Sequence, residues 1–108
     1  MEQQTQECIE QEEMKKNLQQ QNKKFVLVDV RSAEEFAAAH IPDTINIPLN
    51  ELNNRSGRFS REATYITVCG KGGGRSAQAA EILKDKGFNA AWLCGGTATW
   101  FNLRVFLL

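Results

Sequence analysis

The order of the predicted elements indicates an α/β fold, and three observations support this. Residues 25–30 form a continuous apolar, β-branched run, as in parallel strands that are buried on both faces. Similar runs recur at 65–69 and 90–93, and helical patterns separate them. Strands that alternate with helices pair in parallel through right-handed crossovers. The sequence therefore predicts a parallel sheet with helices packed against it.

A chain of 108 residues fits a single domain with one modest core. Its N-terminal part, residues 1–24, is polar and rich in glutamine. We expect a frayed start there, followed by a first helix from Glu10 to Gln21, which belongs to the domain. We therefore predict one domain over residues 5–108, without an internal repeat or a second domain.

The first strand leads into a well-marked helix start. Ser32 and Glu35 have the spacing of a capping box, which predicts a short helix over residues 33–39. Pro42 follows this helix closely, and the residue before a proline avoids the α region. A second short strand is then expected over residues 44–47.

The second half of the chain repeats the alternation of strand and helix. The polar stretch 50–61 is expected to be a loop with a helical turn. After the strand at 65–69, a helix is predicted over residues 76–86, and Gly87 is the expected stop residue. The apolar tail, residues 101–108, is expected either to cap the sheet as a short helix or to form a dimerising end.

Composition and charge argue against several function classes. Thirteen Lys and Arg residues balance thirteen Asp and Glu residues, so no strong field would attract nucleic acid or a membrane surface. No apolar run is long enough to span a bilayer, and the N-terminus lacks the pattern of a signal peptide. We therefore expect a cytoplasmic protein with neither nucleic-acid nor membrane partners.

The three cysteines are Cys8, Cys69 and Cys94. An odd number at wide spacing does not predict a disulfide framework, and a reducing cytoplasm disfavours one. The chain has no Cys-x-x-Cys pair and a single histidine, so no metal site is expected. An individual cysteine is therefore more interesting for its chemistry than for a structural role.

Cys69 ends a predicted strand and is followed directly by a glycine-rich loop. Ligands of open α/β sheets bind beyond the carboxyl ends of strands, and glycines there let backbone amides form an anion-binding nest. The next helix adds its positive end, and Arg75 adds a permanent charge. We expect these features to favour the nucleophilic thiolate of Cys69 and to stabilise an anion on its sulfur. The predicted anion-binding residues are Gly70, Lys71, Gly72, Gly73, Gly74, Arg75 and Ser76.

Several short motifs occur along most of the chain, between Val26 and Trp100. They are Val28-Asp29-Val30-Arg31, Glu35-Phe36, His40-Ile41-Pro42, Asn46-Ile47-Pro48, Cys69 with Arg75-Ser76, and Leu93-Cys94-Gly95-Gly96. In this order they resemble the single-domain rhodaneses, which are thiosulfate or thiol sulfurtransferases. The resemblance implies a five-stranded, mainly parallel sheet of order 1-5-4-2-3, flanked by helices on both faces. Its short first strand would lie near Cys8 and Ile9.

The resemblance also implies a ping-pong transfer of sulfur that needs no cofactor. The Cys69 thiolate would take a sulfane sulfur from a small anionic donor, either thiosulfate or a persulfide. A thiol or cyanide acceptor, or a sulfur-accepting protein, would then remove this sulfur from the Cys69 persulfide. The loop amides and Arg75 would hold the donor, while Lys71 either recruits an anion or is a solvated loop lysine.

The loop departs from the rhodanese pattern in its length. Such rhodaneses commonly have four residues between the cysteine and the arginine, whereas five separate Cys69 from Arg75. This spacing also occurs in rhodanese-related cell-cycle phosphatases, arsenate reductases and other cysteine phosphatases, which usually have a histidine where this chain has Val68. Sulfur transfer is the main prediction. A cysteine-based phosphatase or arsenate reductase, and a non-catalytic binding module, stay open as alternatives.

Four further residues are of interest. The sequence allows two interpretations for Asp29, Arg31 and Cys94, and it favours a structural role for His40. Asp29 and Arg31 are candidates for supporting the site, although ionic hydrogen bonds that tie the first loop to the sheet would also explain them. His40 is expected to be a structural turn residue. Cys94 is a candidate resolving thiol for an oxidised Cys69, because their strands are neighbours in the family order. The alternative is that Cys94 is a small packing residue.

Overall fold

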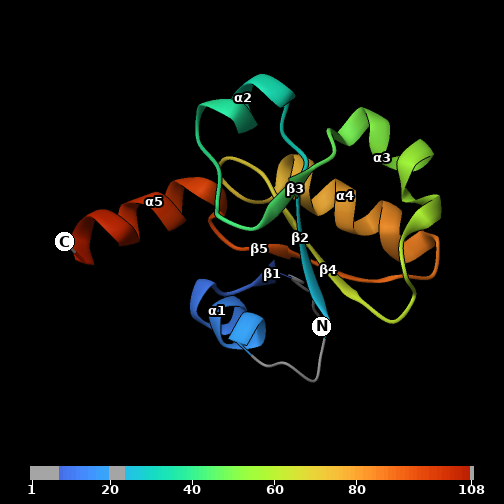
Figure 1. Ribbon diagram of the computed structural model, residues 1–108, viewed down its shortest axis with the longest axis horizontal. Helices are drawn as coiled ribbons and strands as arrows, with labels where there is room; N and C mark the ends of the chain where they lie inside the picture. The colour runs from blue at the N-terminus through green and yellow to red at the C-terminus, as the bar shows by residue number, and fades with distance from the viewer. Residues whose placement is uncertain (1–7, 20–23, 108) are drawn as a thin grey trace, which may run out of the picture.

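The protein is described here by a computed structural model, which covers the backbone of residues 8–19 and 24–107 and the side chains up to residue 102. Five strands form one parallel sheet in the order β1-β5-β4-β2-β3 (Figure 1). This confirms the predicted strand order and the short first strand. The polar segment before Cys8 lies outside the described residues. The strands are β1 (Cys8–Ile9), β2 (Phe25–Asp29), β3 (Thr44–Asn46), β4 (Thr64–Val68) and β5 (Asn89–Leu93).

Helices cover both faces of the sheet. On one face, Leu52 of α3 and Leu83 of α4 belong to a buried cluster that includes Val28. On the other face, Met14 of α1 belongs to a second buried cluster, and Trp100 of α5 packs against this second cluster. Figure 1 shows α5 running outward from the sheet toward the C-terminus. The helices are α1 (Gln11–Gln19), α2 (Ala33–Ala38), α3 (Leu49–Arg55), the 3₁₀ helix η1 (Ser56–Arg58), α4 (Gly74–Asp85) and α5 (Gly96–Leu107).

The predicted secondary structure of residues 50–61 was wrong. We expected a loop with a helical turn, whereas α3 and η1 form nearly continuous helical structure there. Most residues of α3 are exposed, so the segment has almost no apolar pattern. Leu52 is fully buried and anchors the helix in the core. One buried side chain in a polar segment is too weak a signal for sequence-based prediction.

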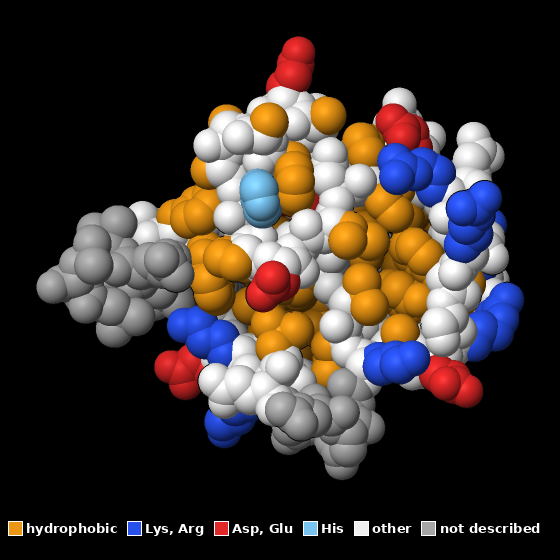
Figure 2. Space-filling model, viewed as in Figure 1, with side chains coloured by type: hydrophobic (Ala, Val, Ile, Leu, Met, Phe, Trp, Pro, Cys, Tyr) orange, Lys and Arg blue, Asp and Glu red, His pale blue; other side chains and the backbone are white. Residues whose placement is uncertain are grey.

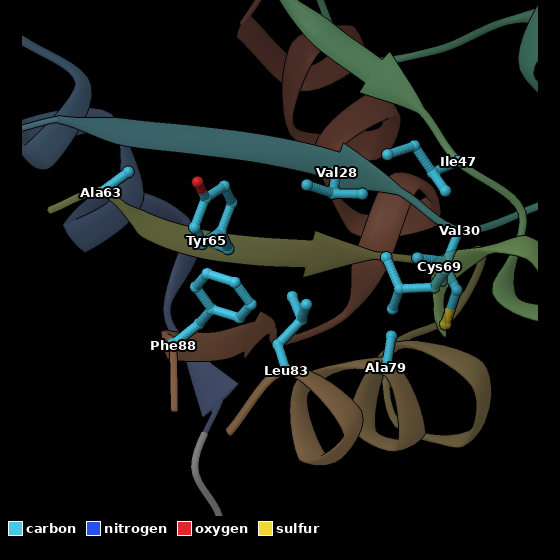
Figure 3. Close-up of a cluster of buried hydrophobic side chains, with 10 residues drawn as sticks. Val28, Val30, Ile47, Ala63, Tyr65, Cys69, Ala79, Leu83 and Phe88 are labelled. Atoms are coloured by element: carbon cyan, nitrogen blue, oxygen red, sulfur yellow. The ribbon is translucent and has the colours of Figure 1, made fainter. Parts of the chain in front are cut away.

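Alternate side chains of the central strands enter the two clusters. In β4, Tyr65 packs on the α3 and α4 face, whereas Ile66 and Val68 pack on the α1 and α5 face. Cys69 follows Val68 directly after the strand ends, and its side chain is again on the α4 face. Figure 3 shows its sulfur turned toward α4, close to Val30 and Ala79. The period of two along β4 therefore decides which layer the Cys69 side chain faces.

On the face shown in Figure 2, hydrophobic side chains gather between the strands and the α3–η1 segment, and Lys and Arg side chains stand around the outer edge. Basic and acidic side chains both occur along this edge, so no side of the visible surface is uniformly charged. Within the part of the chain that the structure describes, no helix has the length and apolar character needed to cross a membrane.

Candidate active site

Cys69 occupies the carboxyl end of β4, in the middle of the sheet. Its side chain is only 4% exposed and belongs to the cluster on the α4 face. The neighbouring strand β2 is hydrogen-bonded at the same level, since the Val30 amide donates to the Val68 carbonyl at 2.9 Å. The structure therefore holds the cysteine on rigid backbone, at the sheet edge where open α/β folds bind ligands.

The sulfur of Cys69 contacts two oxygen atoms from the start of α4. Its Sγ lies 3.2 Å from the Gly73 carbonyl and 3.2 Å from the Ser76 hydroxyl, which itself donates to the Gly73 carbonyl at 3.0 Å. Ser76 is fully buried, and its carbonyl accepts from the Thr67 hydroxyl at 2.7 Å. The segment that carries Cys69 therefore contacts both the backbone carbonyl and the side chain of Ser76.

This arrangement differs from the nest of amides that the sequence suggested. Gly72, Gly73 and Gly74 do have positive φ angles. Within the described residues, however, the hydrogen bonds of the Cys69 sulfur go to a carbonyl and a hydroxyl, and no backbone amide donates to it. The thiol donates to the Gly73 carbonyl in this state. A thiolate would instead accept a hydrogen bond from Ser76, whose hydroxyl can rotate.

The loop is braced from behind by the turn after β5 and by the first turn of α5. The Thr97 amide donates to the Cys69 carbonyl at 2.9 Å, and the Ala98 amide donates to the Gly70 carbonyl at 2.8 Å. A Cβ atom on Gly96 would collide with the Cys69 carbonyl, and one on Gly72 would lie 2.6 Å from the backbone nitrogen of residue 95. Glycine at both positions lets the two backbones approach each other.

Gln11 extends this bracing to α1, and the sequence analysis did not single it out. Its side-chain amide donates to the carbonyls of Cys94 and Gly96, at 2.7 and 3.2 Å. Gln11 is 5% exposed although it lies in a polar segment. A buried glutamine in such a segment leaves no local signal, because its burial depends on the long-range contact with β5.

Arg75 does not point into the loop in this structure. Its guanidinium donates to both carboxylate oxygens of Glu35 in α2, at 2.9 and 3.3 Å. Hydrogen bonds from Arg75 and from the Ser32 backbone lower the pKa of Glu35 to about 2. The hydrogen bond to Glu35 raises the pKa of Arg75. Arg75 is therefore a permanent cation beside the site, and Lys71 is an exposed residue of the loop.

Asp29 and Arg31 form a buried ion pair at the end of β2. Arg31 donates from Nε and Nη2 to the Asp29 carboxylate at 2.9 and 2.8 Å, and from Nη2 to the Ala39 carbonyl at 2.7 Å. The bond to Asp29 raises the pKa of Arg31. Asn46 donates to the carbonyls of both residues at 3.0 Å. These contacts tie the segment around α2 to the sheet, which explains the pair without a catalytic role.

Local signals at α2 were sufficient for prediction. The capping box between Ser32 and Glu35 is present in both directions, as predicted. His40 stacks on Phe36 with ring centroids 3.8 Å apart, and its Nδ1 lies 2.9 Å from the Phe36 carbonyl. His40 is thus engaged where α2 ends, as expected for a turn residue.

Cys94 does not have the free thiol that the predicted resolving role requires. Its sulfur forms a disulfide with Cys8. The two Cα atoms are 5.1 Å apart, and the two residues are 86 positions apart in the sequence. The physical reason is that β1 pairs with β5 and places Cys8 opposite Trp92. Cys94 is therefore not a free thiol in this structure, and the expectation that the cysteines form no disulfide was wrong. Cys69 is the free cysteine of the three.

The disulfide between Cys8 and Cys94 also affects whether these residues can bind a metal ion. Cys8, Glu10 and Cys94 bring three potential ligand atoms within 4.8 Å of one another. The two sulfur atoms are bonded to each other, however, so neither offers a thiolate to a metal in this state.

A cavity of about 560 Å³ lies between the start of α2, α3 and α4. Apart from Arg75, its lining residues were not predicted, although their spacing carries a signal. Leu49, Asn50 and Asn53 lie on one side of α3, and Arg75, Gln78 and Ile82 lie on one side of α4. Only the fold shows that these two sides face each other. Val30, Ser32 and Pro48 complete the lining.

Comparisons with known proteins agree with this architecture. The family model of the Rhodanese-like domain matches residues 10–103. A rhodanese-related protein from Thermoplasma volcanium is 29% identical and superposes with a TM-score of 0.78, covering 88% of this chain and 90% of that one.

Several curated relatives carry names from sulfur chemistry, and two of them illustrate the similarity. The protein "Adenylyltransferase and sulfurtransferase uba4" of Ogataea parapolymorpha is 37% identical over 75 residues, which is 68% of this chain and 19% of that protein. YtwF of Bacillus subtilis (strain 168), provisionally named a sulfurtransferase, is 27% identical over 79 residues, covering 73% of this chain and 76% of that protein. Several other curated relatives are longer, and the chain spans 33% or less of their length.

Proposed function

Since the chain belongs to the rhodanese-like family, we propose that it is a sulfurtransferase that carries a sulfane sulfur as a persulfide on Cys69. The observation that carries the proposal is the setting of the Cys69 thiol. It is the free cysteine, it ends a central strand, and a buried hydroxyl lies 3.2 Å from its sulfur. The names of the relatives support the same class of reaction.

The proposed reaction has two displacement steps. In the first, the Cys69 thiolate attacks the outer sulfur of thiosulfate or of a persulfide. A new S–S bond forms as the donor's S–S bond breaks, and sulfite or a thiolate leaves with the electron pair. In the second, a thiolate or cyanide attacks the outer sulfur of the persulfide, and the Cys69 thiolate leaves. Atoms and charge balance without any cofactor.

Ser76 has the geometry to assist both steps. Its hydroxyl can donate to the Cys69 thiolate before the attack and again as the thiolate leaves. Arg75 supplies positive charge at the side of the site, where it would attract an anionic donor. The exposed Lys71 would add to this attraction.

The contacts favour a sulfur adduct over a phosphoryl adduct. A phosphocysteine needs donors for its anionic oxygens, as does a bound arsenate. Here the Gly73 carbonyl, an acceptor, lies against the sulfur, and Arg75 is engaged with Glu35. A persulfide adds one sulfur atom and makes smaller demands on the loop. We therefore retain the phosphatase and arsenate reductase alternatives only as outcomes of the test.

The test is mass spectrometry of the intact protein after incubation with thiosulfate, together with a thiosulfate-to-cyanide assay. We expect one added sulfur on Cys69, and we expect Cys69→Ser to abolish both the adduct and the turnover while thermal unfolding stays unchanged. Phosphate release from an aryl phosphate without any sulfur adduct would identify a phosphatase, and reduction of arsenate without a sulfur adduct would identify an arsenate reductase. None of these activities in a folded protein would indicate a binding module.

A further inference from the structure

A second group of chemically reactive side chains lies where β1 leads into α1, beside the end of β5 (Figure 1). Its members are Cys8, Glu10 and Cys94, whose two sulfurs and one carboxylate oxygen all lie within 4.8 Å of one another. The two cysteines are half-buried and the glutamate is exposed, so a reductant and a metal ion can approach from solvent. The hydrogen bonds described for the Cys69 sulfur involve none of these residues. The group is therefore separate from the candidate active site.

Contacts other than the disulfide hold this group in place. The Cys94 amide donates to the Ile9 carbonyl at 2.9 Å, which continues the pairing of β1 with β5 past its last register pair. The Gln11 side chain donates to the Cys94 carbonyl at 2.7 Å. The Glu10 carbonyl accepts from the amide of Met14, a fully buried residue, at 2.9 Å. Breaking the S–S bond therefore frees two thiols on backbone that is anchored by other bonds.

The spacing of the three ligand atoms suits a tetrahedral metal ion. Zn²⁺ binds thiolate sulfur at about 2.3 Å and carboxylate oxygen at about 2.0–2.2 Å, so its ligand atoms lie roughly 3.5–3.8 Å from one another. Atoms that are already within 4.8 Å of one another need only small movements to reach this separation. The Cα atoms of Cys8 and Cys94, 5.1 Å apart, can stay where they are, because side-chain rotation separates the sulfurs once they are no longer bonded.

The donor set also favours zinc over the common hard cations. Thiolates are ligands for Zn²⁺ and other thiophilic ions, whereas Ca²⁺ and Mg²⁺ take oxygen ligands. Three protein ligands leave the fourth tetrahedral position to water, as in open zinc sites. The set is hidden in the sequence, since Cys94 follows Cys8 by 86 positions and only the pairing of β1 with β5 joins them.

We propose that Cys8, Glu10 and Cys94 form a zinc site that exists only when the disulfide is reduced. A dithiol reductant breaks the S–S bond, becomes a disulfide itself, and leaves one proton on each cysteine sulfur. Zn²⁺ displaces these two protons, binds both sulfurs and the carboxylate, and keeps one water. A disulfide oxidant reverses the change: it takes two electrons from the thiolates, the S–S bond forms again, and Zn²⁺ is released. The site does not depend on sulfur transfer by Cys69.

Zinc binding by the intact protein in both redox states tests this proposal. The wild type would be reduced with a phosphine, freed of reductant without oxygen, and titrated with Zn²⁺ against a chromophoric chelator. We expect one Zn²⁺ per chain, bound about 100-fold or more tightly than by the disulfide form, because only thiolates are ligands. Thiol titration would verify the redox state of each sample. Co²⁺ as a spectroscopic probe should give sulfur-to-metal charge-transfer absorption in the reduced protein alone.

Matched variants assign the ligands in the reduced state, where the wild type has no disulfide either. Cys94→Ser should weaken Zn²⁺ binding about 100-fold, and Glu10→Gln should weaken it about tenfold, because each removes one ligand. Glu12→Gln, which changes an exposed carboxylate in the first turn of α1, should leave the affinity unchanged. Cys69→Ser should bind Zn²⁺ as tightly as the wild type.

Each other result would overturn the zinc site. Equal binding in the two redox states, or unchanged binding in Glu10→Gln or Cys94→Ser, excludes the three-ligand set. Loss of binding in Cys69→Ser would place the metal on a different sulfur. Circular dichroism would check the fold, and a reduced wild type that is unfolded and that Zn²⁺ does not refold also contradicts the proposal. Where Cys94→Ser does not fold, the Co²⁺ spectrum of the reduced wild type decides whether thiolates bind the metal.

Discussion

At the scale of single residues, the local signal predicted that Cys69 ends a central strand, but it did not predict the contacts of its side chain. Cys69 was predictable because a strand, a glycine-rich loop and a helix follow one another directly in the sequence. The contact between its sulfur and the Ser76 hydroxyl depends on how α4 begins, which the composition of the loop does not specify. The same holds for Arg75, whose bond to Glu35 joins residues 40 positions apart.

The contact with Ser76 leads to a prediction. Ser76→Ala should lower kcat/KM for sulfur transfer by about 10- to 100-fold, since a hydrogen bond to a charged group contributes about 1.5–3 kcal/mol. Steady-state kinetics with a persulfide donor would measure the loss. Ser56→Ala is a matched control, because Ser56 is equally buried and its hydroxyl has no hydrogen-bond partner among the described residues. Unchanged kinetics in a folded Ser76→Ala protein would remove Ser76 from the reaction.

At the scale of elements, strands and capped helices were predictable, whereas a polar helix was not. The strands β2, β4 and β5 are recognisable as mainly apolar runs, and α2 begins with a capping box that can be recognised from two residues. The helix α3 has one fully buried side chain and a polar remainder, so its existence depends on the tertiary contact of Leu52. Because α3 forms a wall of the cavity, the site could not be completed from the sequence.

The ion pair between α2 and the start of α4 gives a prediction about pH. The Glu35 carboxyl group should titrate at about 2, below its ordinary value of 4.5. A lowered pKa in the folded state means that the pair stabilises the fold above the ordinary value and that this contribution disappears as the pH falls toward 2. The contribution should be at most about 1 kcal/mol, because the pair is exposed.

NMR titration of the Glu35 carboxyl carbon would measure this midpoint directly. In Arg75→Ala the midpoint should rise, although it should stay below 4.5 because the Ser32 amide still donates to the carboxylate. Arg55→Ala removes another exposed arginine that pairs with a glutamate, Glu51, and should leave the titration of Glu35 unchanged. A wild-type midpoint near 4.5 would mean that Arg75 is free to face the loop in solution.

At the scale of the whole molecule, the strand order followed from the family resemblance and was confirmed, but its consequence for the cysteines was missed. A short strand near Cys8 and Ile9 was expected at the edge of the sheet beside β5. That placement already brings Cys8 close to the end of β5, where Cys94 lies. We considered only the strand on the other side, which carries Cys69. A cytoplasmic location stays a prediction, and the disulfide is a reason to test it.

The disulfide predicts how stability depends on redox conditions. It joins residues 86 positions apart, so it restricts nearly the whole unfolded chain. A bond that closes so long a loop is expected to stabilise a domain by about 2–4 kcal/mol, mainly by lowering the entropy of the unfolded state. Cys8→Ser and Cys94→Ser should therefore each lower the free energy of unfolding by about this amount without reductant, whereas Cys69→Ser should not.

Denaturant unfolding with and without a thiol reductant would measure these differences. Reduction should bring the wild type down to the level of the two variants and should change the variants little, because they have no disulfide to lose. The bond also lies next to the turn that braces the Cys69 loop, where Gln11 holds the Cys94 carbonyl. Equal stability of wild type and Cys8→Ser without reductant, together with alkylation of all three cysteines in the wild type, would show that the bond does not form in solution.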